Sequence, residues 1–509
     1  MKIQRLSAWF AFLAILTLFG ASLQVTAQGN GWSEPVQLAG DRSSWFADVA
    51  VDTNGGVHVV YSSSQPRENE VFDWDVLMYR VLRNGEWSPE NDIASPGAAG
   101  SVVRNSLAMG RDGRLHALIR SDFRIDYMSA PLDQAESAAA WTAPRRINNG
   151  DLSYYDELAL DSKNTRHVVW TEQSTPDPDN PNIKKTCPLC SELYYRRSSD
   201  GISWSTPFNL SQMPEGSDKP HIAIDSLDRV HVAWDEGRDR FSASDPKYGA
   251  YRRSDDGGAT WKPTVLFSLT NDAVQQTAIG LQGDGTPIVV YRSSKTDAMY
   301  YQVEEADHVT WTDPALLPGV RARSVDETPY DRYSLVTDGG GNVHLFFVGY
   351  YVGDPGYLGR PRLLHMTWNG QAWIAAETVL ANELYPEWPS AVVEDGNTIH
   401  LVWFSRRQED RFASDNAQYR VWYSRKTIDQ KAATPPPQFT PTPTTLPTAT
   451  PQPTSQPTPY PTLDPTLASH GLISRQPRPE EDGVTLLFLS SLPVTAMALM
   501  IWVIRRARR

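Results

Sequence analysis

Arginines, carboxylates and aromatic side chains recur at fixed places beside a repeated hairpin, and these residue types could together bind a ligand. Six residues before the Asp, or its substitute, that ends the first strand of each hairpin stand Phe46, Arg104, Tyr155, Lys219, Gln276, Arg332 and Trp388. Two positions further on stand Asp48, Ser106, Glu157, His221, Ala278, Ser334 and Ser390. Immediately after the second strand stand Ser62, Arg120, Thr171, Asp235, Arg292, Val348 and Phe404. The alternative for any single residue is a solvated loop charge or an ion pair between repeats.

The hairpin that carries these rows is clearest in IAIDSLDRVHVAW, residues 222–234. Apolar residues alternate there with a period of two, which suits strands and not a helix. Ser and Asp residues at 225–228 supply turn chemistry, because their side chains bond their own backbone. The same pattern recurs, with His or its replacement at 58, 116, 167, 231, 288, 344 and 400. The spacing predicts one supersecondary unit per repeat.

Two further strand-like pieces follow each hairpin. One is rich in Tyr and Arg, as in ELYYRRS (192–198), and the next begins at a Trp, as in SWSTPFNL (203–210). Four strands in each period of about 57 residues are typical of a β-propeller. The first tryptophan strand, at 31–39, precedes the first hairpin, and none follows Arg425. We therefore predict an all-β fold over residues 28–430: a seven-bladed β-propeller of four-stranded antiparallel blades, closed by the N-terminal strand beside 419–425.

The two ends of the chain have the composition of export and anchoring segments. Residues 1–27 combine a charged start, a short apolar run and small residues at the end, which predicts a signal peptide; the alternative is a retained membrane helix. Residues 431–482 form a Pro/Thr-rich spacer, predicted to be disordered. Residues 483–504 carry no charge and predict a transmembrane helix, and the arginines of 505–509 predict a cytoplasmic tail. The propeller is therefore expected outside the cell, anchored in the membrane.

Composition limits the partners that can be expected. The formal net charge of −13 argues against nucleic acid, which needs a basic surface. We expect a monomer with no cofactor. A structural calcium ion is left open, because the stretch DPDNPN at 177–182 is acid-rich and nothing more.

Two kinds of residue could suggest a metal or redox site. Cys187 and Cys190 are the only cysteines, and in an exported chain they predict a disulfide that pins one loop. The recurring histidines occupy equivalent places in different repeats, so they cannot meet at one ion. We expect them to be structural, packed and hydrogen-bonded between sheets, and we predict no metal site.

The segment SDDGGATW, residues 254–261, fits the pattern Ser-x-Asp-x-Gly-x-Thr-Trp in full. This is the Asp box, and through it, the tryptophan strands and the hairpins the chain resembles the sialidase-like (bacterial neuraminidase repeat) propellers over residues 31–425. Ser254 and Asp256 are expected to bond within the turn, Gly258 to permit positive φ, and Trp261 to pack into the blade. The Asp box is a folding device, which the resemblance places on the face opposite the active site.

The resemblance implies one function for the residues around the central opening of the predicted ring, that of an exo-α-sialidase-type glycoside hydrolase. Such enzymes hold the sugar carboxylate with arginines, use a Tyr paired with Glu as nucleophile and an Asp as acid/base. By position, the residues for the carboxylate are Arg104, Arg120, Arg292 and Arg332. Tyr155 with Glu157, and Asp48, would carry out the catalysis. The family's N-terminal Arg-Ile-Pro motif is missing, and its members usually have six blades.

The reading that we favour is a non-catalytic recognition head that binds a glycan or a protein ligand at the opening. Aromatic faces on which sugars or partner side chains could stack are supplied by Trp45, Phe46, Tyr154, Tyr155, Tyr350, Tyr351, Tyr385 and Trp388. A purely structural surface module is the third possibility.

Overall fold

The fold is known from a computed structural model that describes residues 30–65, 74–95, 102–121, 124–150, 152–173, 190–213, 215–238, 246–324, 332–354, 360–380, 384–407 and 418–432. The chain divides into two compact units, 1–442 and 443–509, and only the first contains described residues. The predicted signal peptide, the transmembrane helix, the basic tail and nearly all of the spacer lie outside these ranges. No helix within them is long and apolar enough to cross a membrane.

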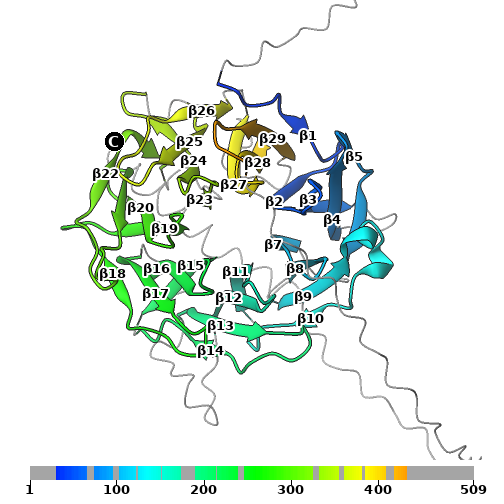
Figure 1. Cartoon of the computed structure of the whole chain (residues 1–509), viewed down its shortest axis with the longest axis horizontal. Helices are drawn as coiled ribbons and strands as arrows, with labels where there is room; N and C mark the ends of the chain where they lie inside the picture. The colour runs from blue at the N-terminus through cyan, green and yellow to red at the C-terminus, as the bar shows by residue number, and fades with distance from the viewer. Residues whose placement is uncertain are drawn as a thin grey trace, which may run out of the picture. The chain divides into compact units, whose positions relative to one another are not determined.

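The described part of the first unit is an all-β propeller, whose sheets follow one another around a ring (Figure 1). The first sheet has β2 (Ser44–Val51), β3 (Val57–Gln65), β4 (Trp74–Arg83), β5 (Glu86–Trp87) and β6 (Asn91–Ala94). The second has β7 (Val102–Met109), β8 (Arg114–Ser121), β9 (Arg124–Pro131) and β10 (Arg145–Arg146). Two 3-10 helices, η1 (Leu132–Gln134) and η2 (Ala138–Ala140), lie between β9 and β10. The third has β11 (Leu152–Leu160), β12 (Arg166–Gln173), β13 (Glu192–Ser198) and β14 (Phe208–Asn209). The fourth has β15 (Gly216–Ile224), β16 (Val230–Arg238), β17 (Tyr248–Ser254) and β18 (Val265–Phe267).

The ring closes as the sequence predicts. The last sheet contains β27 (Tyr385–Glu394), β28 (Thr398–Arg406) and β29 (Tyr419–Thr427), and its outer strand is β1 (Val36–Gln37) from the start of the chain. Val36 lies opposite Tyr423 and Gln37 opposite Trp422 in the antiparallel pairing. The prediction that residues 31–39 pair with 419–425 is therefore confirmed.

The prediction of seven separate four-stranded blades is wrong in its count. Five sheets are separate blades, but the fifth and sixth repeats share one eight-stranded sheet. Its strands are β19 (Val274–Leu281), β20 (Pro287–Ser293), β21 (Ala298–Val303), β22 (Ala315–Ala322), β23 (Ser334–Thr337), β24 (Val343–Tyr351), β25 (Arg362–Trp368) and β26 (Glu377–Leu380). The physical reason is the length of β22, whose end, residues 320–322, pairs with 349–351 of β24.

The core lies between neighbouring sheets. One buried cluster joins Val60 and Tyr79 of the first sheet to Leu115 and Ala117 of the second, and Trp141 covers it. Burial of apolar surface between sheets, and not within one central core, therefore stabilises the ring.

The histidine row is buried, and its hydrogen bonds run within each sheet, not between sheets as predicted. Five histidines each bond the hydroxyl of a tyrosine on the next strand at 2.6–2.8 Å, in the pairs His58–Tyr79, His116–Tyr127, His167–Tyr195, His231–Tyr251 and His400–Tyr423. In the sixth repeat His344 bonds His365 instead, at 2.8 Å. The other ring nitrogen faces the carboxylate of the hairpin turn, as in His58 Nε2 to Asp52 at 3.0 Å. A carboxylate only accepts, so Nε2 carries the proton and Nδ1 accepts from tyrosine.

The turn after β17 is closed by side-chain hydrogen bonds. Ser254 Oγ accepts the Gly258 N–H at 2.7 Å, and Asp256 accepts the N–H of Thr260 at 2.8 Å. Trp261 packs edge-on against Tyr195 of the preceding sheet, with 4.9 Å between ring centroids. Gly258 has φ +81°, and a Cβ there would lie 1.7 Å from the Tyr195 hydroxyl. This turn therefore joins two neighbouring sheets.

Candidate functional site

The innermost strands β2, β7, β11, β15, β19, β23 and β27 surround the centre of the ring (Figure 1). Six of them contain a β-bulge near their first residues, where the pairing with the next strand shifts register. Five non-glycine residues at the bulges have φ between +48° and +61°, namely Phe46, Arg104, Lys219, Gln276 and Trp388. A left-handed backbone conformation costs such residues roughly 1–2 kcal/mol each, so contacts with the surrounding residues must stabilise it. A bulge changes the direction of the side chains beside it, and these bulges lie at equivalent places in the innermost strands.

Arg104 is the centre of this group. Its guanidinium carbon lies 4.2 Å from the ring centroid of Tyr154 and 4.3 Å from that of Tyr155. Phe46 and Trp388 lie further out, at 5.2 and 5.8 Å. Among the described residues no carboxylate is within ion-pair distance of Arg104, and its buried Nε has no hydrogen-bond partner. A buried cation is thus packed among aromatic faces, and the carboxylate of Asp218 acts on it without forming an ion pair.

Arg120 of β8 lies beside Arg104 and shares an aromatic neighbour with it. Its guanidinium carbon is 4.7 Å from the Tyr154 centroid, and Nε donates to the Ser153 carbonyl at 3.0 Å. Burial, and then the charge of Arg104, lower the pKa of Arg120 to about 10. Burial is the larger cause, and the contribution of Arg104 shows that the two cations repel each other.

The carboxyl of Asp156 of β11 interacts with both arginines, and sequence reasoning missed it. Both of its oxygens are buried without a hydrogen-bond partner. Burial raises the pKa of Asp156 to about 7, against the lowering effect of Arg120 and Arg104. Strict alternation pairs Tyr155 with Glu157 on one face, but the bulge between Ser153 and Asp156 breaks the alternation.

Arg332, just before β23, joins the group from the opposite side of the ring. It forms an ion pair with Glu157 of β11, and its guanidinium carbon lies 5.6 Å from the Trp388 centroid. Glu157 also accepts the Ile222 N–H at 2.8 Å and lies 3.7 Å from His221. Burial raises the pKa of Glu157, and burial together with Arg332 holds the pKa of His221 well below its usual range.

Asp48 and Glu157 belong to a set of bonds that link adjacent sheets around the centre. Asp48 accepts the Leu107 N–H at 2.7 Å and the hydroxyl of Ser390. The equivalent Ser106 accepts the Leu158 N–H at 3.0 Å. Each bond joins the innermost strand of one sheet to that of the adjacent sheet, so this row of residues stabilises the ring. Burial raises the pKa of Asp48.

The remaining predicted ligand-binding residues divide between two environments. Trp388 is 6% exposed and its ring lies 5.0 Å from that of Phe46, so it packs in the core and offers no open face for stacking. Arg292 is fully buried, pairs with Asp297 and donates to the carbonyl of Arg323. None of these contacts involves Arg104, so the structure gathers three of the four predicted arginines. We call Arg104, Arg120 and Arg332, with Tyr154, Tyr155 and Asp156, the arginine cluster.

The predicted disulfide and the calcium stretch belong to the connection between β12 and β13. Cys190 is buried and carries no free thiol. Cys187 and residues 177–182 lie outside the described ranges, so both predictions stand as made. Within those ranges no three His, Cys, Asp or Glu side chains are grouped in a way that could hold a metal ion.

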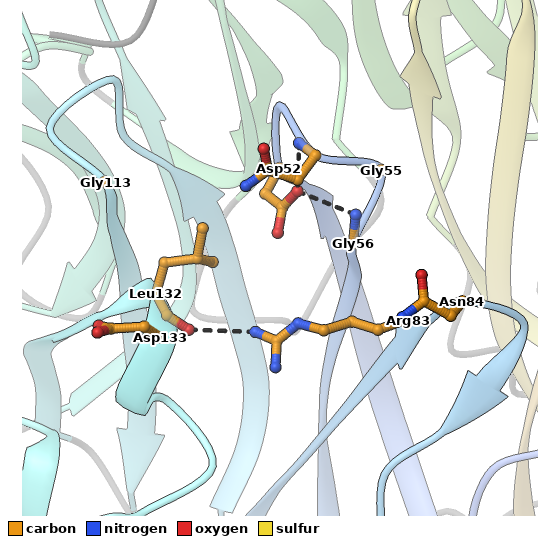
Figure 2. A pocket seen from close by; sticks show the side chains of 9 residues that line it. Asp52, Gly55, Gly56, Arg83, Asn84, Gly113, Leu132 and Asp133 are labelled. Atoms are coloured by element: carbon orange, nitrogen blue, oxygen red, sulfur yellow. Dashed lines mark hydrogen bonds between the residues drawn. The ribbon is translucent and has the colours of Figure 1, made fainter.

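A cavity of about 560 Å³ lies at the other end of the first two sheets (Figure 2). Asp52, Gly56, Arg83 and Leu132 are among its lining residues. Two of its charged groups already have partners, because Asp52 accepts the Gly56 N–H at 2.9 Å and Arg83 donates to the Leu132 carbonyl at 3.2 Å. The arginine cluster, in which the buried Nε of Arg104 has no hydrogen-bond partner, is the stronger candidate.

No protein-family profile and no curated protein sequence matches the chain. Among solved structures, an ulvan lyase from a new family of polysaccharide lyases is similar with a TM-score of 0.50 and 10% identity, over 78% of this chain and 97% of its own. A protein of unknown function from Dyadobacter fermentans DSM 18053 gives 0.47 at 15% identity, over 78% and 100%. NanB sialidase from Streptococcus pneumoniae gives 0.42 at 12% identity, over 79% and 71%. At these identities the likeness to the ulvan lyase concerns the fold alone, which agrees with the all-β propeller described above.

Proposed function

We propose that this protein recognises an acidic glycan, whose carboxylate is held by the arginine cluster. The observation that carries the proposal is Arg104, a buried guanidinium with an unbonded Nε and no carboxylate partner among the described residues. A guanidinium binds a carboxylate through two parallel N–H donors, so an acidic ligand would supply the missing partner.

The charges around Arg104 support an anion as the ligand. Arg120 adds a second cation, whose pKa is lowered by burial and then by the charge of Arg104, and an anion would relieve this repulsion. The carboxyl of Asp156 is only partly ionised at neutral pH and bonds neither arginine. The pair therefore keeps net positive charge inside a chain whose formal net charge is −13.

The aromatic residues support a sugar as the body of that ligand. Tyr154 and Tyr155 are half-buried, with ring centroids 5.1 Å apart and nearly perpendicular. Such rings can pack against the apolar face of a sugar beside the carboxylate. A protein ligand with an exposed acidic side chain meets the same cations and is the alternative that the experiment below must separate.

The wider setting is part of the proposal. The propeller would be a seven-repeat member of the sialidase-like Asp-box family, exported through residues 1–27 and held outside the cell by the spacer 431–482 and the helix 483–504. The composition of these segments supports that arrangement. A cell-surface position would give the cluster access to extracellular polysaccharides.

The test is titration calorimetry on the full chain in detergent micelles, with sialyllactose and oligogalacturonate as acidic probes and maltotetraose as a neutral one. Saturable binding of an acidic probe alone is expected. Arg104→Ala should weaken it about 10- to 100-fold, because a hydrogen-bonded ion pair contributes about 1.5–3 kcal/mol.

Arg83→Ala is the matched control, since it removes one guanidinium at the cavity of Figure 2 and leaves the cluster intact. Its affinity should equal that of the wild type. Equal binding of acidic and neutral probes, or loss in Arg83→Ala and not in Arg104→Ala, would reject the arginine cluster as the site.

Sialidase-type hydrolysis is the second candidate function. It is favoured by one observation, that Tyr155, Arg104, Arg332 and Glu157 gather in one place. Turnover of a fluorogenic sialoside by the wild type, lost in Tyr155→Phe with binding retained, would establish it. Binding without turnover leaves recognition as the function.

A further inference from the structure

Asp156 is an unusual carboxyl within the arginine cluster. Its side chain is more than nine-tenths buried, and neither oxygen has a hydrogen-bond partner. Buried carboxylates in proteins are nearly always bonded, and each exception requires an explanation. By contrast, Glu157, the next residue, is bonded to Arg332 and to the Ile222 N–H.

The charged groups that act on Asp156 come from four elements. Arg104 of β7, Arg120 of β8 and Arg332 before β23 favour its carboxylate form. Burial and the neighbouring Glu157 of β11 favour its neutral form. Burial outweighs the arginines and raises the pKa to about 7, so near neutral pH a small change in the local charge decides whether the proton is bound.

We infer that Asp156 is a proton-coupled counter-charge, which takes up one proton when an acidic ligand binds to Arg104 and Arg120. This inference rests on the proposed function. In the free protein the Asp156 carboxylate, with both oxygens unbonded, partly compensates these two cations, and Asp218 also acts on Arg104. A bound ligand carboxylate or sulfate replaces it, and two anions beside one pair of arginines repel each other, so Asp156 becomes neutral.

The sign of the pH dependence follows. Asp156 has a pKa of about 7 in the free protein, and a bound anion raises it further. Below about pH 7 the carboxyl is neutral in both states, so the dissociation constant is independent of pH. Above about pH 7 the free protein loses the proton that the complex keeps, so the dissociation constant rises by up to about tenfold per pH unit.

The experiment is titration calorimetry of the full chain with inorganic sulfate and with sialyllactose, from about pH 5 to about pH 9. Neither probe titrates in this range, so any pH dependence belongs to the protein. Repetition in buffers with different ionisation enthalpies gives the number of protons taken up. The wild type should take up close to one proton per anion at about pH 8, and none at about pH 5.

Asp156→Asn and Asp156→Ala are the test variants, and Glu236→Gln is the matched control. Glu236 is a second buried carboxyl with a pKa of about 8, but it is bonded to Trp234 and Ser217, away from the arginines. Both Asp156 variants should bind without pH dependence or proton uptake, at least as tightly as the wild type at low pH. Glu236→Gln should keep the wild-type profile.

The outcomes separate the two proposals. If neither probe binds at any pH, the proposed function fails and this inference with it. If a probe binds through Arg104 with a flat pH profile, the function stands and the coupling is refuted. If Glu236→Gln abolishes the pH dependence and Asp156→Asn keeps it, the proton belongs elsewhere and the coupling is refuted too.

Discussion

Removal of one buried hydroxyl should measure what the histidine row contributes to the ring. His58 and Tyr79 are both fully buried, and His58 Nδ1 lies 2.6 Å from the Tyr79 hydroxyl. Since Asp52 engages the other ring nitrogen, Nδ1 depends on that hydroxyl as its donor. Tyr79→Phe keeps the ring and its packing but leaves a buried acceptor unpaired. We expect a loss of about 1–3 kcal/mol in the free energy of unfolding.

The chain contains its own control for this change. In the fifth repeat Tyr301 lies opposite Val290, as Tyr79 lies opposite Val60, but Ile288 stands where His58 stands in the first. The Tyr301 hydroxyl therefore has no histidine at the position that His58 occupies relative to Tyr79. Tyr301→Phe should change the free energy of unfolding by less than about 0.5 kcal/mol.

The measurement is urea unfolding of both variants, followed by tryptophan fluorescence. The midpoint should fall for Tyr79→Phe with an unchanged dependence on urea, and should stay near the wild-type value for Tyr301→Phe. Equal effects in the two variants would refute the reasoning, because they would show that the hydroxyl acts through packing or solvation common to both sites.

Two further predictions concern the ring as a whole. Burial lowers the pKa of His58, His116 and His231 in the folded state, so each of these histidines makes the free energy of unfolding fall as the pH decreases through about 6.5, whereas the raised pKa values of Asp156 and Glu236 act in the opposite sense. Between about pH 8 and about pH 5 the urea midpoint of a His58→Gln variant should therefore rise relative to that of the wild type, and a constant difference would contradict the prediction. Gly258→Ala should destabilise the protein by more than about 1 kcal/mol, because the new Cβ meets the Tyr195 hydroxyl in addition to the cost of positive φ. Gly85→Ala has a similar φ of +84° with open space around it, and thermal unfolding should place it closer to the wild type.

Repetition made the fold readable from the sequence. The alternation around each hairpin predicts strands, and seven copies with a displaced tryptophan strand predict a ring closed by the N-terminus. Pairing of Val36 with Tyr423 confirms that closure. Repetition does not predict where one sheet ends, because the length of a strand depends on the strands with which it pairs in the fold. β22 runs on to pair with β24, so two expected blades share one sheet.

The rows of residues around the centre of the ring could be predicted from the same repetition, and the structure brings Arg104, Arg120 and Arg332 together. The sequence did not predict the individual environment of each of these residues. Trp388 and Phe46 pack against each other, and Arg292 turns to Asp297, because the partner in each case comes from a distant part of the chain.

The amino-acid sequence by itself determined the strands, their order around the ring and the kinds of residue at its centre, since all three follow from local pattern and its recurrence. Only the tertiary structure decided the roles of Asp156 and Glu157. A period of two assigns neighbouring residues to opposite faces, but a bulge adds one residue and breaks that rule. Whether a buried carboxyl has a hydrogen-bond partner depends on side chains from other sheets. The local sequence pattern does not predict which side chains these are.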